Sequence, residues 1–571
     1  MVKMFGGNRV LIYLLDLNFG RLPPEVKPSR SERESETNGR LQRQGGRTSF
    51  NKQIPFCTEK AHGRRMSQKL LKEAFISNLN GTSLLEISIG LTLAPLCIAC
   101  RGLLLILYKL HNGRSLRSRK YHLLLDFTVL VAPFVLGCTI LSPILHLLPI
   151  TIGAFCAGLF YKIYNRRNHY IRTPPKQIIH DFLKTSLEPD YIPSITVFRV
   201  YVNVLTAINI LAVDFPQYPR RYAKTETYGT GAMDFGVGAF IFGNALVCPE
   251  VRQKTGVVQS KFSCLARQLL SVWPLVFLGL GRLISVKAVE YHEHFSEYGV
   301  HWNFFFTLAI VRMTASLLLT LFPTNKSWIV AVILAVFYQL ILDTTHLKMF
   351  VLYGSDGKDT RLGFLNANRE GVFSLYGYLA IYMASVQVGL YVLKKRTLVK
   401  DWIEVICFFL LTVFILFIFL HMSQVYVEPV SRRMANLSFC IWIVAQCLTF
   451  FICFLVTDLI LVFTKLLVNG SRVPCCWNFT QPPTTNTKHD SEPASIKRER
   501  KWLSICIINA IDKNQLVFFL LANVMTGIVN MMIDTIHSNT SFTLFVLHLY
   551  MFTNCLIMYI LHAKNILLKC W

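Results

Sequence analysis

The sequence predicts an all-α polytopic membrane protein, a bundle of about 13 transmembrane helices with short functional loops. Three observations support this fold class. Of the 571 residues, 53% are hydrophobic and only 16% are charged, which is too apolar for a soluble chain of this length. The apolar residues gather in runs of about 20, the length that crosses a bilayer. Lys and Arg residues fall in the short segments between these runs, as they do beside membrane spans.

Two regions differ in composition. Residues 1–65 are rich in Arg, Ser, Glu, Gly and Pro, and their one apolar run, Val10 to Phe19, is too short to cross a bilayer. We expect this region to be a disordered extension, or one that the mature protein lacks, with Met66 as an alternative start. Residues 66–571 are expected to form the transmembrane domain. Within it, residues 465–513 are expected to form a flexible cytosolic loop.

From Met66 onward, thirteen apolar runs are long enough to cross a membrane. No period of 20 to 50 residues indicates an internal repeat. The runs cover residues 87–108, 122–139, 143–162, 194–213, 230–248, 268–285, 302–322, 327–346, 373–393, 402–422, 436–464, 514–533 and 541–562.

The distribution of basic residues predicts the orientation of these helices. The loops after the odd-numbered runs, together with the C-terminus, hold more than twice as many Lys and Arg residues as the opposite side counted from Met66. Because basic loops stay in the cytosol, we expect a cytosolic C-terminus and a luminal N-terminus. The net charge of +27 is explained by these flanks and does not indicate a nucleic acid partner. The luminal loops mix both charge signs with Gly, Asn and aromatic residues, so we expect the chemistry there.

The stretch Leu211 to Phe240 carries an unusual density of charge between long apolar runs. Prolines and glycines shape its backbone, which favours an ordered loop. Ordered loops with ionisable side chains are common positions for catalytic residues. The simpler alternative is an interfacial loop whose charges are solvated. The charged residues are Asp214, Arg220, Arg221, Lys224, Glu226 and Asp234.

Asp214 and Lys224 are the candidates for catalysis. Asp214 closes the fourth apolar run directly before Phe215-Pro216, where the helix must end and contact with water falls, so its carboxylate can accept a proton from an alcohol. Lys224 can stabilise a developing oxyanion or hold the carboxylate in position. The alternative is an ordinary salt bridge between the two at the membrane interface.

The other charges in this stretch are candidates for substrate binding. Arg220 and Arg221 suit phosphate groups because their guanidinium forks are planar, although arginines beside a bilayer also anchor lipid head groups. Glu226 is a further candidate for substrate binding. Asp234 lies inside the fifth apolar run, where a buried carboxylate indicates function; otherwise it caps the helix or pairs with Arg221 or Lys224.

Two further luminal segments offer polar side chains that suit a sugar or an inositol. The segment NANREG supplies the amides of Asn366 and Asn368 and the guanidinium of Arg369, and it is equally suited to cap the ninth helix. Arg432 and Arg433, in the segment SRRMAN, have the same two interpretations.

The remaining motifs are less specific. Arg199 and Arg282, inside apolar runs, either pair within the bundle or line a polar channel. Cys475 and Cys476 suit lipidation better than metal binding. No set of Cys and His residues has metal-ligand spacing, so no metal is predicted, and no GxSxG, Walker A or dinucleotide-binding motif occurs.

Several long segments resemble one family, the phosphatidylinositol-glycan biosynthesis class W proteins, which are the inositol acyltransferases of GPI-anchor assembly. The resemblance runs from about Met66 to the C-terminus. It rests on FISNLNGTSLLEI, LAVDFPQYPRRYAKTETYGTGAMDFGVGAFIFG, SVWPLVFLGLGRL, EYGVHWNFFFT, NKSW, LYGSDG, LNANREG and VSRRMANLSFCIWIVA.

The resemblance implies an endoplasmic-reticulum membrane enzyme that moves a long acyl chain, usually palmitoyl, from acyl-CoA to the 2-hydroxyl of inositol in glucosaminyl-phosphatidylinositol. It implies thirteen helices, luminal chemistry, and acyl-CoA as a co-substrate with no further cofactor. The acid and lysine of the family correspond to Asp214 and Lys224. Two alternatives stay open from the residues alone: a proton-coupled lipid or solute transporter, and a non-catalytic subunit of GPI assembly.

Overall fold

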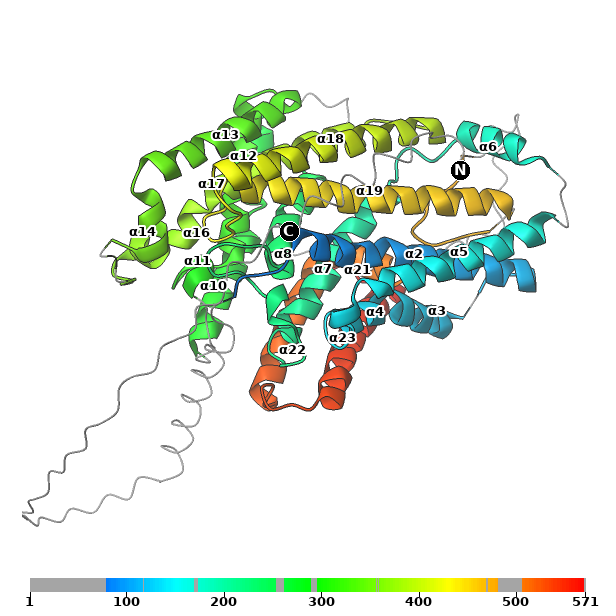
Figure 1. Ribbon diagram of the computed structural model, residues 1–571, viewed down its shortest axis with the longest axis horizontal. Coiled ribbons are helices and arrows are strands. Elements are labelled where there is room, and N and C mark those ends of the chain that lie inside the picture. Colours follow the sequence, from blue (N-terminus) through cyan, green and yellow to red (C-terminus); the bar gives the residue numbers. More distant parts are fainter. Residues whose placement is uncertain are drawn as a thin grey trace, which may run out of the picture. The chain divides into compact units, whose positions relative to one another are not determined.

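The structure, a computed structural model, describes residues 79–568 except for 117, 169–172, 253–260, 289–294, 356, 358, 469–470 and 481–505 (Figure 1). All described residues belong to one compact unit, His62–Trp571. They form helices and no β-strand, and only two isolated β-bridges occur among them, Ser186–Leu398 and Leu187–Phe479. The predicted all-α class is confirmed.

Twelve of the thirteen predicted spans are confirmed as apolar helices, or short helical series, long enough to cross a membrane. The helices of the described segments begin and end as follows: α2 (Leu84–Asn112), α3 (Arg119–Asp126), η1 (Phe127–Val131), α4 (Ala132–Gly137), η2 (Ser142–Ile144), α5 (Leu147–Asn168), α6 (Pro175–Lys184), α7 (Pro193–Ala212), η3 (Arg220–Tyr222), α8 (Ala232–Ala245), α9 (Lys261–Leu270), α10 (Trp273–Ala288), α11 (Phe295–Tyr298), α12 (Phe304–Leu321), η4 (Thr324–Lys326), α13 (Ser327–Thr344), α14 (Leu347–Tyr353), α15 (Phe364–Ala367), α16 (Arg369–Phe373), α17 (Leu375–Val392), α18 (Val399–Tyr426), α19 (Leu437–Leu467), α21 (Ile507–Lys513), α22 (Gln515–Met532) and α23 (Thr540–Ala563).

The remaining predicted span, 230–248, is shorter than expected. It forms α8, a helix of 14 residues that packs against α7, α17 and α19. At 1.5 Å per residue such a helix is about 21 Å long, less than the hydrocarbon core of a bilayer. Because protein surrounds α8, its apolar composition reflects burial inside the bundle.

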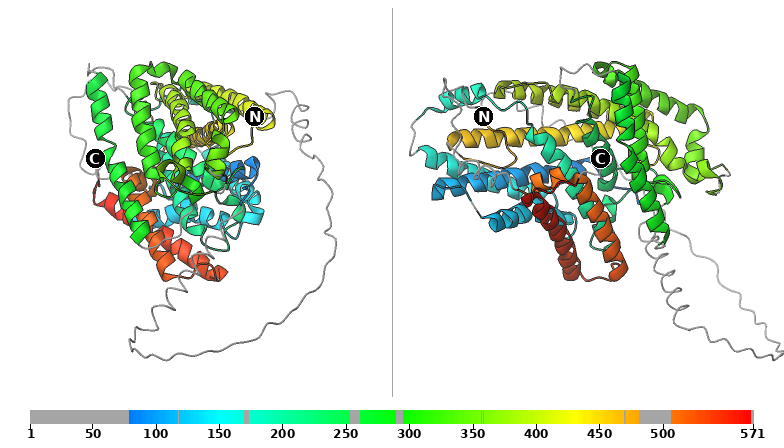
Figure 2. Two further views of the ribbon diagram at one scale, coloured as in Figure 1. Left: turned by 90° about the vertical axis from the view of Figure 1, so that its left-hand side faces the viewer. Right: turned by 180° about the vertical axis from the view of Figure 1, so that it is seen from behind.

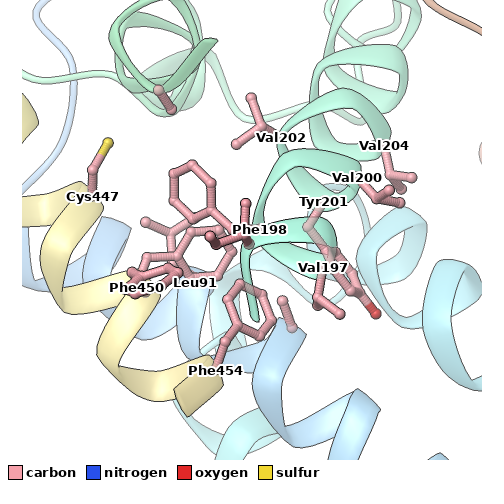
Figure 3. Close-up of a cluster of buried hydrophobic side chains, with 14 of the residues drawn as sticks. Leu91, Val197, Phe198, Val200, Tyr201, Val202, Val204, Cys447, Phe450 and Phe454 are labelled. Atoms are coloured by element: carbon pink, nitrogen blue, oxygen red, sulfur yellow. The ribbon is translucent and has the colours of Figure 1, made fainter. Parts of the chain in front are cut away.

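The longest helix, α19, lies in the core of the bundle. In its most apolar window 72% of residues are buried, against 28% for its neighbour α18, although both are strongly apolar. Figure 1 shows α18 and α19 side by side, and Figure 2 shows the same pairing from behind. The buried face of α19 presents Phe450 and Phe454 to Phe198 of α7 and to Leu91 of α2 (Figure 3). The exposed apolar face of α18 therefore fits contact with lipid.

The segment expected to form one flexible loop, 465–513, contains ordered parts. Helix α19 continues to Leu467, residues 471–480 pack against the bundle, and α21 is largely buried. Arg101 and Asp126 form a buried ion pair, in which Arg101 also donates to Pro474 O and Asp126 accepts from Ile507 N. These bonds attach the described parts of the segment, residues 471–480 and α21, to the bundle.

The same packing corrects the expectation that two cysteines are lipidated. Cys475 and Cys476 are both buried, at 7% and 3% exposed. Cys475 Sγ lies 3.1 Å from Cys506 Sγ and 3.0 Å from Asn509 Oδ1. A thiol in this position faces protein and is inaccessible to an acyl donor.

Candidate active site

Asp214 lies where α7 ends and the chain turns. The helix closes with Asp214 N donating to Leu211 O, and Pro216 follows, so the helix cannot continue. The carboxylate is 5% exposed, and its Oδ2 accepts a hydrogen bond of 2.7 Å from Asn530 Nδ2 of α22. The turn and the bond from α22 together fix the orientation of the carboxylate.

Arg220 holds this turn closed. Its Nη2 donates to the carbonyl oxygens of Val213 and Phe215, both at 2.8 Å, and to that of Tyr218 at 3.1 Å. The guanidinium thus satisfies the carbonyl groups that the end of a helix leaves without partners. Arg220 positions Asp214 through the backbone and does not line the cavity described below.

Arg221 and Tyr222 attach the same loop to α2. Arg221 Nε lies 2.9 Å from Glu86 Oε1, and the Tyr222 hydroxyl donates to the same oxygen at 2.5 Å. Ahead of α2, Thr82 N donates to Thr230 O at 2.7 Å. The residues just before α2 and its first turn therefore hold both ends of the segment that carries Lys224.

Lys224 pairs with Glu297 of α11, and among the described residues no ion pair joins it to Asp214. The alternative of a salt bridge between the two catalytic candidates is therefore not seen. The side chain of Lys224 is 28% exposed and that of Glu297 is 17% exposed, so the ammonium of Lys224 keeps contact with the cavity described below. An ammonium has three donors, and one is used here.

Asp234 is fully buried and pairs with Arg432, which replaces the alternative of a pairing with Arg221 or Lys224. Its Oδ1 lies 2.8 Å from Arg432 Nε, and its Oδ2 accepts from the backbone N and the Oγ1 of Thr225 at 3.0 and 2.8 Å. Because Thr225 follows Lys224 directly, the Asp234 carboxylate fixes the backbone beside the lysine.

One cavity of about 520 Å³ brings the two catalytic candidates together. Asp214, Lys224 and Glu226 all line it, with walls from α10, α22 and the loop before α8. We name it the catalytic cavity. Its other charged and amide side chains are Arg282, Glu297, Asn303, Arg432 and Asn523.

Two further cavities adjoin the catalytic cavity. The apolar cavity, of about 190 Å³, shares Lys224, Arg282 and Glu297 with it and is otherwise lined mainly by apolar side chains of α2, α7 and α8. The arginine cavity, of about 330 Å³, shares Phe240 and Phe519 with the apolar cavity. It is lined by Arg199, Arg252 and Arg312 together with Asn203, Asn244 and Gln515.

Comparison with known proteins places this chain in a family. The family model GWT1 matches residues 68–561. The chain belongs to the GWT1 family. Glucosaminyl-phosphatidylinositol-acyltransferase PIGW of Bos taurus is 55% identical, and that of Homo sapiens is 53% identical; each alignment covers 89% of this chain and the whole of the relative. GPI-anchored wall transfer protein 1 of Aspergillus fumigatus is 32% identical over 83% of this chain and 93% of its own. The resemblance drawn from the sequence motifs is confirmed.

Four substrate-binding candidates of this GWT1-family chain lie apart from the three cavities. Arg369 is fully buried and donates to Val351 O at 3.1 Å and to Asn366 Oδ1 at 2.9 Å. Asn368 Oδ1 accepts from His301 N at 2.8 Å, and Arg433 Nη2 lies 2.9 Å from Glu370 Oε1. The described hydrogen bonds and ion pairs of Asn366, Asn368, Arg369 and Arg433 therefore join loops to one another.

The structure adds two residues to the site that the sequence did not single out, Glu297 and Asn530, and it also brings Arg432 to the site. Glu297 holds Lys224, Asn530 holds Asp214, and Arg432 balances Asp234. Glu297 was recognisable only as one acid in a loop of mixed charge that was predicted to be luminal, and Asn530 lies in an apolar run with no charge to mark it. Arg432 stands beside Arg433 in the sequence, yet only Arg432 lines the catalytic cavity.

Proposed function

We propose that this protein transfers a long-chain acyl group from acyl-CoA to the 2-hydroxyl of inositol in glucosaminyl-phosphatidylinositol, in the endoplasmic-reticulum membrane. One observation carries the proposal: in a GWT1-family chain, Asp214 and Lys224 line the same cavity among apolar helices. The curated mammalian relatives have a name that states this acceptor and an acyl transfer.

The reaction is a direct transfer. The Asp214 carboxylate accepts the proton of the inositol hydroxyl, and the oxygen attacks the thioester carbonyl to form a new C–O bond. The Lys224 ammonium stabilises the oxyanion that forms. When the C–S bond breaks, the sulfur of CoA leaves as a thiolate and receives the proton from Asp214. The carboxylate is thereby restored, and no Ser or Cys nucleophile is used.

Protein contacts orient both catalytic groups of the proposed reaction. Asn530 fixes the carboxylate of Asp214, and Glu297 fixes the ammonium of Lys224, so both groups are oriented before substrate binds. Glu226 lines the same cavity and is the proposed partner of the ammonium group of the glucosamine. The acceptor is itself a membrane lipid, so it reaches the cavity from the bilayer that surrounds the helices.

The arginine cavity is the proposed binding site for the phosphates of acyl-CoA. Arg220 and Arg221 were candidates for this role, but their guanidinium groups hold backbone carbonyls and Glu86. Arg199, Arg252 and Arg312 line a cavity that adjoins the apolar cavity, which in turn adjoins Lys224. The pantetheine arm passes through the apolar cavity, and the acyl chain lies along the apolar walls of α10 and α22.

The experiment incubates the purified full-length protein with palmitoyl-CoA and glucosaminyl-phosphatidylinositol. We expect release of the CoA thiol and an acylated lipid, and their loss in Asp214→Asn. Asp534→Asn is the matched control, because Asp534 is 48% exposed and lines none of the three cavities. Transport of lipid or solute without thiol release would overturn the proposal.

The donor route has its own test. Arg312→Gln is expected to raise the KM for palmitoyl-CoA by about tenfold or more and to leave the KM for the acceptor unchanged. A palmitoyl thioester of N-acetylcysteamine carries no phosphate, so its KM is expected to be the same for the wild type and the variant. An equal rise in KM for both donors would place the CoA phosphates elsewhere.

A further inference from the structure

Arg282 is a charged residue in a membrane-spanning helix, α10, at the junction of two cavities. It lines both the catalytic cavity and the apolar cavity. An arginine within a membrane helix is costly unless a counter-ion accompanies it. Within the described part of the chain, no carboxylate lies within ion-pair distance of Arg282.

The neighbouring charges of the catalytic cavity have protein partners. Glu297 pairs with Lys224, and Arg432 pairs with the buried Asp234. Asp214 accepts from Asn530. The protein thus balances the other cations of this cavity, Lys224 and Arg432, and leaves the Arg282 guanidinium facing the cavities. A bound ligand is therefore expected to supply the anion for Arg282.

We propose that Arg282 binds the phosphodiester of the lipid acceptor and so positions the inositol hydroxyl against Asp214. This inference rests on the proposed function. In the acceptor, the phosphodiester is carried by the inositol carbon next to the one that bears the 2-hydroxyl. A residue that holds the phosphate therefore decides where the hydroxyl lies. The guanidinium fork forms two parallel hydrogen bonds with a phosphate, which fix its orientation as well as its position.

A phosphate can come from either substrate. The donor carries its phosphates on CoA, at the far end of the pantetheine arm from the thioester. Three guanidinium groups line the arginine cavity at that end, those of Arg252, Arg312 and Arg199, and Arg199 also lies 3.9 Å from Asp512. Arg282 lines the same cavity as Asp214 and Lys224, where the thioester and the hydroxyl must meet. Of the phosphate groups of the two substrates, the phosphodiester of the acceptor is therefore the one that lies near Arg282 during the reaction.

Steady-state kinetics separate the two sources. For Arg282→Gln we expect the KM for glucosaminyl-phosphatidylinositol to rise about tenfold or more, with the KM for palmitoyl-CoA changed less than about twofold. Arg282→Lys keeps the charge and loses the fork, so a partial recovery is expected. Lys287→Gln is the matched control: Lys287 is in the last turn of α10 and lines neither cavity. A rise in the KM for the donor alone would overturn the proposal.

A neutral acceptor provides the second readout. If the phosphodiester is methylated to a triester, the wild type is expected to lose about as much kcat/KM as Arg282→Gln loses with the natural acceptor. The variant is expected not to distinguish the two acceptors. A variant that still prefers the charged acceptor as strongly as the wild type does would refute the contact, even though acyl transfer itself stands.

Binding without turnover makes the test independent of catalysis. Short-chain glucosaminyl-phosphatidylinositol is titrated into the Asp214→Asn protein and into the Asp214→Asn/Arg282→Gln protein by calorimetry. We expect the Kd to be about tenfold higher, or more, in the double variant. Equal affinities would overturn the role of Arg282, whether or not the wild type transfers acyl groups.

Discussion

The guanidinium of Arg432 lies 2.8 Å from the carboxylate of Asp234, and the two side chains are 1% and 0% exposed. This pair joins the loop before α19 to the first turn of α8. Through Thr225, which donates twice to Asp234, it also holds the backbone next to Lys224. Because both charges are out of water, neither can lose its partner at low cost.

Removing one partner of this pair is expected to destabilise the protein strongly. Arg432→Gln or Asp234→Asn should each cost about 3 to 5 kcal/mol, because the other charge stays buried without compensation. The double variant Asp234→Asn/Arg432→Gln should recover part of this loss. The measurement is the midpoint temperature of thermal unfolding, with size-exclusion chromatography used to detect the loss of folded protein. A double variant that is less stable than both single variants would contradict the pairing.

Glu297→Gln is expected to lower activity while sparing stability. The Lys224–Glu297 pair is partly exposed, so its loss should change the free energy of unfolding by less than about 1 kcal/mol. Without the carboxylate, the ammonium of Lys224 is no longer oriented, and we expect kcat to fall at least about tenfold. Glu297→Asp, which keeps the charge, should retain more activity. Equal kcat for Glu297→Gln and the wild type would show that Glu297 does not position Lys224.

The hydrogen bonds that Glu428 accepts from Tyr228, Lys348 and Asn436 are expected to weaken in acid. Burial raises the pKa of Glu428, but hydrogen bonds from Lys348, Tyr228 and Asn436 outweigh it, so the net shift is downward from 4.5. Burial, together with the contact to Glu428, raises the pKa of Tyr228 to about 12. A carboxylate with a lowered pKa stabilises the fold above its pKa in the unfolded chain. That contribution is therefore lost as the pH falls below about 4.5.

The matching variant is Glu428→Gln. At pH 7 it should unfold at a lower temperature than the wild type, and the difference should shrink as the pH falls below about 4.5. Thermal unfolding at a series of pH values from 7 to about 3.5 measures this. Glu404→Gln, at a side chain 68% exposed, is the control and should follow the wild type throughout. A constant difference across the series would contradict the assignment.

Gly81 is expected to tolerate no side chain. Its φ is +79°, and an added Cβ would lie 2.3 Å from Thr230 O. Gly113 has a similar φ of +68° with no atom within 4 Å of the added Cβ, so it isolates the backbone strain. We expect Gly113→Ala to cost about 1 kcal/mol and Gly81→Ala to cost more, with a loss of acyl transfer as the loop around Lys224 shifts. Comparable unfolding temperatures and activities for the two variants would contradict this.

The sequence predicted most of the helices because a bilayer imposes one length and one composition on each span. The helix at the predicted span 230–248, α8, is shorter than predicted, with 14 residues, because a helix enclosed by protein needs no fixed length. Asp214 and Lys224 were found from the density of charge and from the family motifs. The structure places both on one cavity.

The partners of these residues were not predictable. Lys224 and Glu297 are 73 residues apart, and Tyr228 and Glu428 are 200 apart. Such ion pairs and hydrogen bonds depend on how loops from different helices meet, and a single sequence records no such proximity. The same limit explains why Asn366 and Arg369 were assigned to substrate, since a polar loop has the same composition whether it binds a ligand or another loop.

The bonds from the Arg101–Asp126 pair to Pro474 O and Ile507 N have a practical consequence. They anchor the chain on each side of residues 481–505, so the attachment of α21, α22 and α23 to the bundle does not depend on that connection. We therefore expect that the gene can be divided there and that the two fragments can be expressed separately. Fragments that associate into an active protein would give a two-component reporter of assembly in the membrane.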